Sequence, residues 1–305
     1  GPFESGGRLS TNYGGNRGRE LPIDQRIEEI TIMKKVLFIL LSVISTATIA
    51  QGIKMPAPSP GQSIKQDFSL SSVEVKYSRP VIKGRKIFGD VVPFGKLWRT
   101  GANSPTTVTF NEDVKIAGQA LKAGTYQLIS IPSQFSWEII FNKGSNGVFN
   151  YKPEEDVLKV KLATTTLSQS IESFSIHFAN VTANKMEMVI SWEKVAVSIP
   201  IETEIDAKIT ASIDKAMAAD TRPYFESASY YLETGKDLKK ALEWAIKAVE
   251  ANASAYWIWH LQAKIQAKLG DKVGAKASAE KSMALAKEGK NEDYVTLNLK
   301  LIQSL

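Results

Sequence analysis

The central part of the chain alternates hydrophobic and polar residues with a period of two. Val73, Val75 and Tyr77 are separated by Glu74 and Lys76, which is the pattern of a strand with one buried face. The same alternation recurs at residues 108–110, 126–128, 135–141, 158–162, 174–178, 186–192 and 195–201. Short strands separated by turn residues, with no helical pattern between them, predict an antiparallel β-sandwich over residues 67–203.

A tight turn precedes the third alternating run, where Gly124 and Thr125 lead into Tyr126. A glycine followed by a tyrosine at a strand start is typical of a tyrosine corner, in which the phenol bonds to a nearby backbone group. A core tyrosine placed after a tight turn explains these residues equally well. Both interpretations give Tyr126 a structural role.

After Ile201 the hydrophobic period changes from 2 to 3.6, which indicates helices. Thr203 with Asp206 three residues later is typical of a capping box and predicts a helix over residues 203–219. Thr221 and Pro223 predict the start of another helix. The hydrophobic face of the first predicted helix is formed by Ile205, Ile209, Ile213 and Met217.

An internal repeat follows in the C-terminal part of the chain. Ala241 and Ala275 lie 34 residues apart, which is the tetratricopeptide period, and Gly235 precedes the first as Gly270 precedes the second. Small residues at such positions let paired helices approach closely. With a terminal helix over residues 291–305, the pattern predicts a tetratricopeptide-like array of five or six packed helices over residues 204–305. The fold class expected for the whole chain is therefore multidomain, β followed by α.

The N-terminal part carries a targeting signal. Met33, Lys34 and Lys35 begin a short cationic segment, an apolar run covers residues 36–44, and small residues precede Gln51. This predicts a signal peptide over residues 33–50 that is cleaved after Ala50. The apolar run is shorter than the roughly 20 residues that span a bilayer, so we expect no transmembrane anchor in the mature chain.

The segments on either side of this signal lack a folding pattern. Residues 1–32 precede the predicted start and are expected to be disordered, and the proline-rich residues 51–66 are expected to form an extended leader. An exported protein follows from the signal, and it would be periplasmic, associated with the outer envelope or secreted.

The amino-acid composition excludes several classes of functional site. The 305 residues carry a formal net charge of +6, an excess too thin to predict nucleic-acid binding. Cysteine is absent and only two histidines occur, which excludes disulfides, thiolate metal sites, cysteine nucleophiles and multi-histidine metal centres. No zinc-protease, phosphate-loop, dinucleotide or nucleophile-elbow motif is present. We therefore predict no catalytic residue, cofactor or metal, and favour a protein that is not an enzyme.

Carboxylates are the one remaining route to catalysis. Scattered acidic residues could supply a glycosidase-like pair, but nothing in the sequence fixes their separation. The residues in question are Glu154, Glu155, Asp156, Glu172, Glu187 and Glu193.

One loop-like stretch, residues 93–103, concentrates a tryptophan, two cations and an asparagine among glycines. With the cations that precede it, it could bind a phosphate, an acidic glycan or lipid headgroups, Trp98 acting as a stacking plate and Arg99 as a bidentate clamp. Alternatively, Trp98 fills the core and Arg99 braces the loop, and we favour this interpretation. The candidate ligand-binding residues are Arg79, Lys83, Arg85, Lys96, Trp98, Arg99 and Asn103.

Several blocks of the predicted β domain resemble the bacterial domain of unknown function 2911. They are residues 77–80, 83–85, 87–89, 92–103 with their Trp-Arg-Thr-Gly-Ala-Asn sequence, and 123–126. The resemblance covers roughly residues 60–203. It implies a secreted or envelope protein, often with tetratricopeptide-like helices behind the domain, and it carries no established reaction.

Two classes of function follow from these patterns. The first is a non-catalytic envelope protein that binds a protein partner through the helical array. The second is a protein that binds, or acts on, a glycan or another anion through the loop around Trp98 and Arg99. Exposure of these two side chains would favour the second class, and their burial would favour the first.

Overall fold

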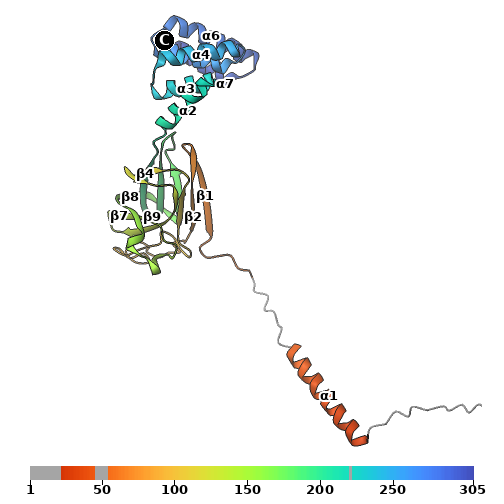
Figure 1. Cartoon of the computed structure of the whole chain (residues 1–305). Helices are drawn as coiled ribbons and strands as arrows, with labels where there is room; N and C mark the ends of the chain where they lie inside the picture. Colours follow the sequence, from red (N-terminus) through yellow and green to blue (C-terminus); the bar gives the residue numbers. More distant parts are fainter. Residues whose placement is uncertain (1–21, 45–53, 220–221) are drawn as a thin grey trace, which may run out of the picture. The chain divides into compact units, whose positions relative to one another are not determined.

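The computed structural model of the chain describes residues 22–44, 54–219 and 222–305. The chain divides into two compact units, Gly1–Pro56 and Ala57–Leu305. The described part of the first unit contains helix α1 (Ile23–Ile44), and the second unit contains nine strands and helices α2 to α7 (Figure 1).

Helix α1 corrects the expectation that all of residues 1–32 are disordered. It begins at Ile23, ten residues before the predicted start of the signal peptide, because its 22 residues contain neither glycine nor proline and Asp24 lies in its first turn. The predicted cleavage site after Ala50 lies outside the described residues. Among the helices of the described ranges, none is long and apolar enough to cross a bilayer.

The nine strands of the second unit form one antiparallel sheet in the order β1-β2-β3-β6-β7-β8-β9-β4-β5. Every strand pairing within it is antiparallel, as the short alternating runs predicted. The strands are β1 (Gly61–Phe68), β2 (Ser71–Ser78), β3 (Thr107–Phe110), β4 (Val114–Ile116), β5 (Gln119–Leu121), β6 (Gly124–Pro132), β7 (Ser136–Asn142), β8 (Asp156–Ala179) and β9 (Lys185–Glu202).

The sheet folds over on itself, so that its two halves enclose one hydrophobic core. The first part of β8 pairs with β7, and the rest pairs with β9. Across the core, the ring of Tyr77 in β2 packs edge-on against Phe174 in β8, with ring centroids 5.7 Å apart. The amide of Ile176 also donates to the Tyr77 hydroxyl at 2.9 Å. Since β2 and β8 are four places apart in the strand order, these contacts establish the predicted sandwich.

The two longest strands each join two of the predicted runs. In β8 the residues between the runs are mostly polar and exposed, and two register shifts occur there, so the alternation is interrupted without the strand ending. In β9 the interruption is at Glu193, whose φ of 55° lies in the left-handed region opposite Ile171. A further hairpin, β4–β5, was not predicted because its strands are three residues long; Ala117 and Gly118, both at positive φ, form its turn.

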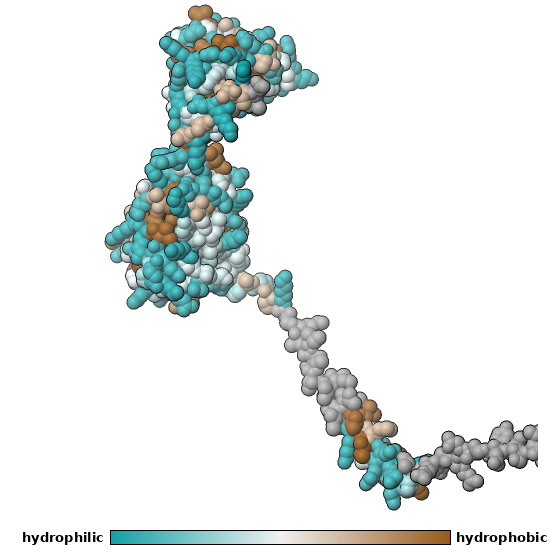
Figure 2. Space-filling model, viewed as in Figure 1, coloured by the Kyte–Doolittle hydropathy of each residue, from teal (hydrophilic) through white to brown (hydrophobic). Residues whose placement is uncertain are grey.

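Strand β1 corrects the expected boundary of the leader. Residues 61–66 were expected to be an extended leader, yet they form most of β1 and pair with β2 along its whole length. The sequence hid this strand because it lies at the edge of the sheet, where Ile64 is the one half-buried aliphatic residue between polar neighbours. Figure 2 shows that the visible face of the β domain is largely hydrophilic, with hydrophobic residues in small patches.

Tyr126 forms the backbone bond that the tyrosine-corner interpretation predicted. It is 7% exposed, and its hydroxyl donates to the carbonyl of Lys122 at 2.8 Å. Gly124, two residues earlier, has a φ of 155°, a conformation that favours glycine.

Six helices follow the strands within the described part of the chain. Aspartate or asparagine side chains cap three of them: Asp237, Asp271 and Asn291 each accept from the amide three residues later. Gly235 and Gly270, both at positive φ, follow α3 and α5. The helices are α2 (Asp206–Ala218), α3 (Tyr224–Thr234), α4 (Leu238–Ala251), α5 (Tyr256–Lys268), α6 (Lys272–Glu288) and α7 (Glu292–Gln303).

The helices have hydrophobic cores of their own. Ala241 and Ala275, the repeat positions, are both fully buried. One cluster includes Ile213 of α2, Trp244 of α4 and Leu261 of α5. The ring of Tyr231 packs on Trp244 with centroids 4.8 Å apart. The helices therefore bury apolar surface against one another, as the period of 3.6 predicted.

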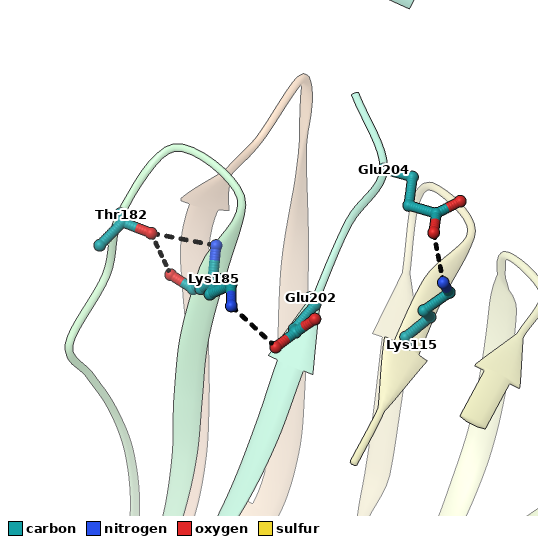
Figure 3. A network of polar contacts seen from close by, with 5 residues as sticks. All are labelled: Lys115, Thr182, Lys185, Glu202 and Glu204. Atoms are coloured by element: carbon teal, nitrogen blue, oxygen red, sulfur yellow. Dashed lines mark hydrogen bonds and ion pairs between the residues drawn. The ribbon is translucent and has the colours of Figure 1, made fainter. Parts of the chain in front are cut away.

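The predicted capping box at Thr203 is wrong. Helix α2 begins three residues later, and the Thr203 hydroxyl donates to Ser69 at the β1–β2 turn, where Thr203 is 4% exposed. Salt bridges fasten the neighbouring residues: Lys185 pairs with Glu202 at 3.3 Å, and Lys115 pairs with Glu204 (Figure 3). Both pairs are exposed and contribute little to stability. The residues that follow β9, Thr203 and Glu204, thus contact the β domain, and the helices begin only after them.

Candidate functional site

Residues 79–106, which we call the Trp98 loop, connect β2 to β3 and contain all seven candidate ligand-binding residues. The loop pairs with β6 as a short extra strand, since the Trp98 amide donates to the Ser130 carbonyl at 2.8 Å and the reverse bond measures 2.9 Å. Its first residues bond to β8 through the Phe174 amide and the Pro80 carbonyl, 2.8 Å apart. The loop is therefore ordered by backbone bonds to both halves of the sheet.

The indole of Trp98 belongs to the core of the β domain. It is half-buried and contacts four aromatic rings, those of Phe174, Trp137, Phe88 and Trp192, at centroid distances of 5.2, 5.7, 6.0 and 6.1 Å. Its Nε1–H donates to the carbonyl of Gly101 at 3.1 Å. One face of the indole is thus stacked on Trp192, the other rings meet it edge-on, and its polar edge is bonded within the fold. Trp98 packs against the hydrophobic core of the β domain, which agrees with the favoured interpretation.

The residues after Trp98 lock the loop in an unusual backbone conformation. Thr100 is fully buried at a φ of 54°, and its hydroxyl lies 2.7 Å from that of Ser130. The Thr106 hydroxyl donates to the Thr100 carbonyl at 2.7 Å. Gly101 has a φ of 151°, and a Cβ there would lie 2.9 Å from the Thr106 hydroxyl. The Thr-Gly pair of the motif is therefore required by the geometry of the loop.

Two of the candidate arginines brace backbone carbonyls. Arg79 donates from Nε to the carbonyl of Phe174 at 2.9 Å. Arg85 donates from Nη2 to Val81 at 2.7 Å and from Nε to Ile82 at 3.0 Å. A guanidinium engaged in this way has fewer donors left for a ligand.

Arg99 and Asn103 also act on the loop itself. The Arg99 guanidinium donates to the Asn103 carbonyl and lies over the ring of Phe149, 5.0 Å from its centroid. The Asn103 side chain donates to the Ser59 carbonyl at 3.1 Å. Phe149 is 84% exposed, so the Arg99–Phe149 pair lies at the surface. Arg99 thus matches the bracing interpretation rather than a free bidentate clamp.

Lys83 and Lys96 are exposed, as are Arg85 and Asn103. Neither lysine forms an ion pair within the described residues. The neighbouring carboxylates are occupied by the loop backbone: Glu172 accepts from the Lys83 amide at 2.9 Å, and Glu193 accepts from the Ile87 amide at 3.3 Å. Two of the acids considered for a glycosidase-like pair are therefore loop braces.

A buried polar cluster holds the segment between β7 and β8. The sequence pattern did not predict it. Asp156 accepts from Asn142 at 2.9 Å, pairs with Lys159 at 2.9 Å and accepts from the Tyr151 hydroxyl. Burial raises the pKa of Asp156, but the hydrogen bonds from Asn142, Tyr151 and Lys159 outweigh it and lower the pKa below its ordinary value. The carboxylate is therefore ionised and fully used in fixing this segment, which contains the 3₁₀ turns η1 (Val148–Asn150) and η2 (Pro153–Glu155).

The helical region carries a groove of about 570 Å³ lined by residues of α3, α5, the start of α6 and the end of the chain. Lys264 and Lys268 lie one turn apart on α5, and Lys272 begins α6. None of the three forms an ion pair within the described residues. Leu232 and Leu301 supply apolar surface beside them. The groove combines positive charge with aliphatic side chains.

Helices α5, α6 and α7 share a buried hydrogen-bond network. His260 Nδ1 lies 2.8 Å from Asn298 Oδ1, Asn298 Nδ2 donates to the Ser282 hydroxyl at 2.8 Å, and Ser282 donates to the Tyr256 carbonyl at 2.7 Å. Because the Asn298 amide group donates to Ser282, its oxygen accepts from His260, which places the imidazole proton on Nδ1. Burial lowers the pKa of His260, opposed by the bond to Asn298. His260 therefore packs between the helices, while His177 is exposed.

The comparisons with known proteins agree with the blocks that carried the sequence resemblance. Residues 59–201 match the model of a family described as a protein of unknown function, DUF2911. The β domain is a DUF2911 domain. Nothing among the curated proteins and nothing among the solved structures matches the chain.

In this DUF2911 domain the motif residues serve the fold. Trp98 fills the core, Arg99 and Arg79 hold carbonyls, and Gly101 takes a conformation that other residues rarely adopt. Within the described residues, no three histidine, aspartate or glutamate side chains gather as a metal ion would require. In the DUF2911 domain, the exposed lysines Lys83 and Lys96 are accessible to an anion.

Proposed function

We propose that this protein is an exported, non-catalytic binding protein in which the C-terminal helices hold a protein partner. Export rests on the signal-like sequence of residues 33–50. The helices are the binding part of this proposal, and the DUF2911 domain docks or spaces the complex. The 34-residue spacing of Ala241 and Ala275 supports a tetratricopeptide-like array, an architecture that binds partners along extended surfaces.

The lysine-lined groove is the observation that carries the proposal. Lys264, Lys268 and Lys272 face one carboxylate side chain in the groove, that of Glu233. A partner segment with acidic residues would pair with the lysines, and an apolar side chain beside them would cover Leu301. We therefore propose an acidic protein segment as the ligand of the groove.

The loop-based alternative receives less support. A glycan or anion site around Trp98 and Arg99 needs a free indole face and a free guanidinium, and both groups are engaged within the DUF2911 domain. Arg79 and Arg85 bond to carbonyls in the same way. The unpaired lysines of the helices are therefore better placed to bind a partner than the engaged groups of the Trp98 loop.

A matched pair of charge-reversal variants tests the groove. Lys264→Glu, Lys268→Glu and Lys272→Glu are combined in one protein. The control combines Lys239→Glu, Lys276→Glu and Lys281→Glu, which are exposed positions of α4 and α6 outside the groove. Both proteins, and the wild type, are used to capture partners from the bacterium's own envelope fraction.

Captured proteins are compared by quantitative mass spectrometry, and circular dichroism verifies that both variants remain helical. We expect acidic partners to be lost from the groove variant and kept by the control. Equal capture by the two variants would contradict a role for the groove.

A further inference from the structure

Apolar side chains are exposed on two turns of the DUF2911 domain. Phe135, in the turn between β6 and β7, is 75% exposed, and Val91 and Phe94, in the Trp98 loop, are 42% and 43% exposed. Lys86 and Lys96 flank the second of these turns and are also exposed. We call these five residues the lysine–aromatic tip.

Backbone bonds hold the two turns of the tip together. The Gly95 amide donates to the Pro132 carbonyl at 2.8 Å, which places Phe94 next to the end of β6. The Thr164 amide donates to the Phe135 carbonyl at 2.9 Å and fixes the β6–β7 turn on β8. The exposed rings therefore stand on ordered backbone, so that little entropy would be lost on binding.

The turn that carries Phe94 is compact. The Val91 amide donates to the Lys86 carbonyl at 3.4 Å, so this lysine lies beside the apolar residues. The ring of Phe94 rests on Gly89, where a Cβ would lie 2.9 Å from its Cε2 atom. A larger residue at Gly89 would displace the ring, and glycine there lets Phe94 keep its position.

Charge at the tip has one predominant sign. Residues 83–96 contain the cations Lys83, Arg85, Lys86 and Lys96 against the single acid Asp90, and residues 130–136 contain no charged side chain. Within the described residues, none of the three lysines forms an ion pair. The tip therefore presents exposed aromatic and aliphatic groups surrounded by unpaired positive charge.

We propose that the lysine–aromatic tip docks on the surface of a bilayer that contains anionic lipids. Phe94, Phe135 and Val91 would enter the interface between headgroups and acyl chains, and Lys86 and Lys96 would contact the phosphates. Exposed apolar groups beside cations fit a lipid surface, which offers both an apolar phase and negative charge. A soluble sugar or nucleotide is bound instead by polar groups that converge in a hollow.

The absence of cysteine in the sequence permits a site-specific test. Phe135→Cys in the full chain is labelled with an environment-sensitive fluorophore and mixed with vesicles of phosphatidylcholine and phosphatidylglycerol in equal amounts. Leu70→Cys, at a 58% exposed position in the β1–β2 turn, is the matched label control. We expect a blue shift at residue 135 and none at residue 70, and no shift at either residue on vesicles of phosphatidylcholine alone.

Charge is tested in the labelled Phe135→Cys protein. Removing Lys86 and Lys96 as Lys86→Gln and Lys96→Gln should weaken vesicle binding about fivefold per lysine. The matched control, Lys208→Gln with Lys215→Gln on α2, removes the same charge from exposed positions away from the tip and should bind like the parent protein.

Three results would overturn the proposal. The first is sedimentation with vesicles without a shift at residue 135, which would place the membrane contact elsewhere in the chain, for example in α1. The second is equal vesicle affinity of the two lysine variants. The third is a shift at residue 135 with soluble heparin and none with vesicles, which would assign the tip to an anionic polysaccharide.

Discussion

Replacing Trp98 with alanine should destabilise the DUF2911 domain, because the indole is part of its core. A buried tryptophan truncated to alanine costs about 3–5 kcal/mol. Trp98 is half-buried, which argues for the lower end of that range, but it also loses contacts with Phe174, Trp137 and Trp192 and its bond to Gly101. We therefore expect a loss of about 3 kcal/mol in the free energy of unfolding.

The assay is thermal unfolding of the full chain followed by circular dichroism. For a unit of this size, a loss of about 3 kcal/mol corresponds to a fall in Tm of roughly 6–12 °C. Lys96→Ala, two residues away and exposed, is the control and should stay within about 0.5 kcal/mol of the wild type. A Trp98→Ala protein as stable as this control would refute the core assignment and return Trp98 to the candidate ligand-binding residues.

Two further predictions concern the helices. Burial holds the pKa of His260 below its ordinary value of about 6.5, so the unfolded state binds a proton before the folded state as the pH falls, and the free energy of unfolding should decrease until the folded pKa is reached. His260→Gln should remove this pH dependence of stability in unfolding experiments between about pH 8 and pH 5, and an unchanged dependence would contradict the assignment. Residues 204–305 expressed alone should be helical and unfold cooperatively, since Ile213, Trp244 and Leu261 pack within the helices; an unfolded fragment beside a stable full chain would move the domain boundary away from Thr203.

Periodicity predicted the elements whose burial alternates regularly. Val73, Val75 and Tyr77 are buried as their spacing required, and so are Trp137 and Ile139 of β7. Phe135, assigned to the same run, lies one residue before the strand and is exposed. A strand pattern does not mark the residue at which the ladder ends, since that depends on the partner strand.

The role of the Trp98 loop could not be read from the loop alone. Its residues are compatible with a ligand site, and what decides against one is contact with residues far away in sequence, such as Trp98 with Trp192 and Arg79 with Phe174. Polar residues at inward positions were missed for a related reason. Asn142 is 1% exposed, but its partner Asp156 lies 14 residues later in another strand.

The path of β8 has a consequence for how the domain is made. The bond between Tyr77 and Ile176 joins residues 99 positions apart, and the first strands cannot close on the core until the second half of β8 exists. At about 5–20 residues per second, a ribosome needs roughly 5–20 s to supply the chain between them. Contacts of such long range also form slowly once the chain is complete. The DUF2911 domain therefore stays open throughout most of its own synthesis, so the export proposed above would act on a chain that has not yet closed.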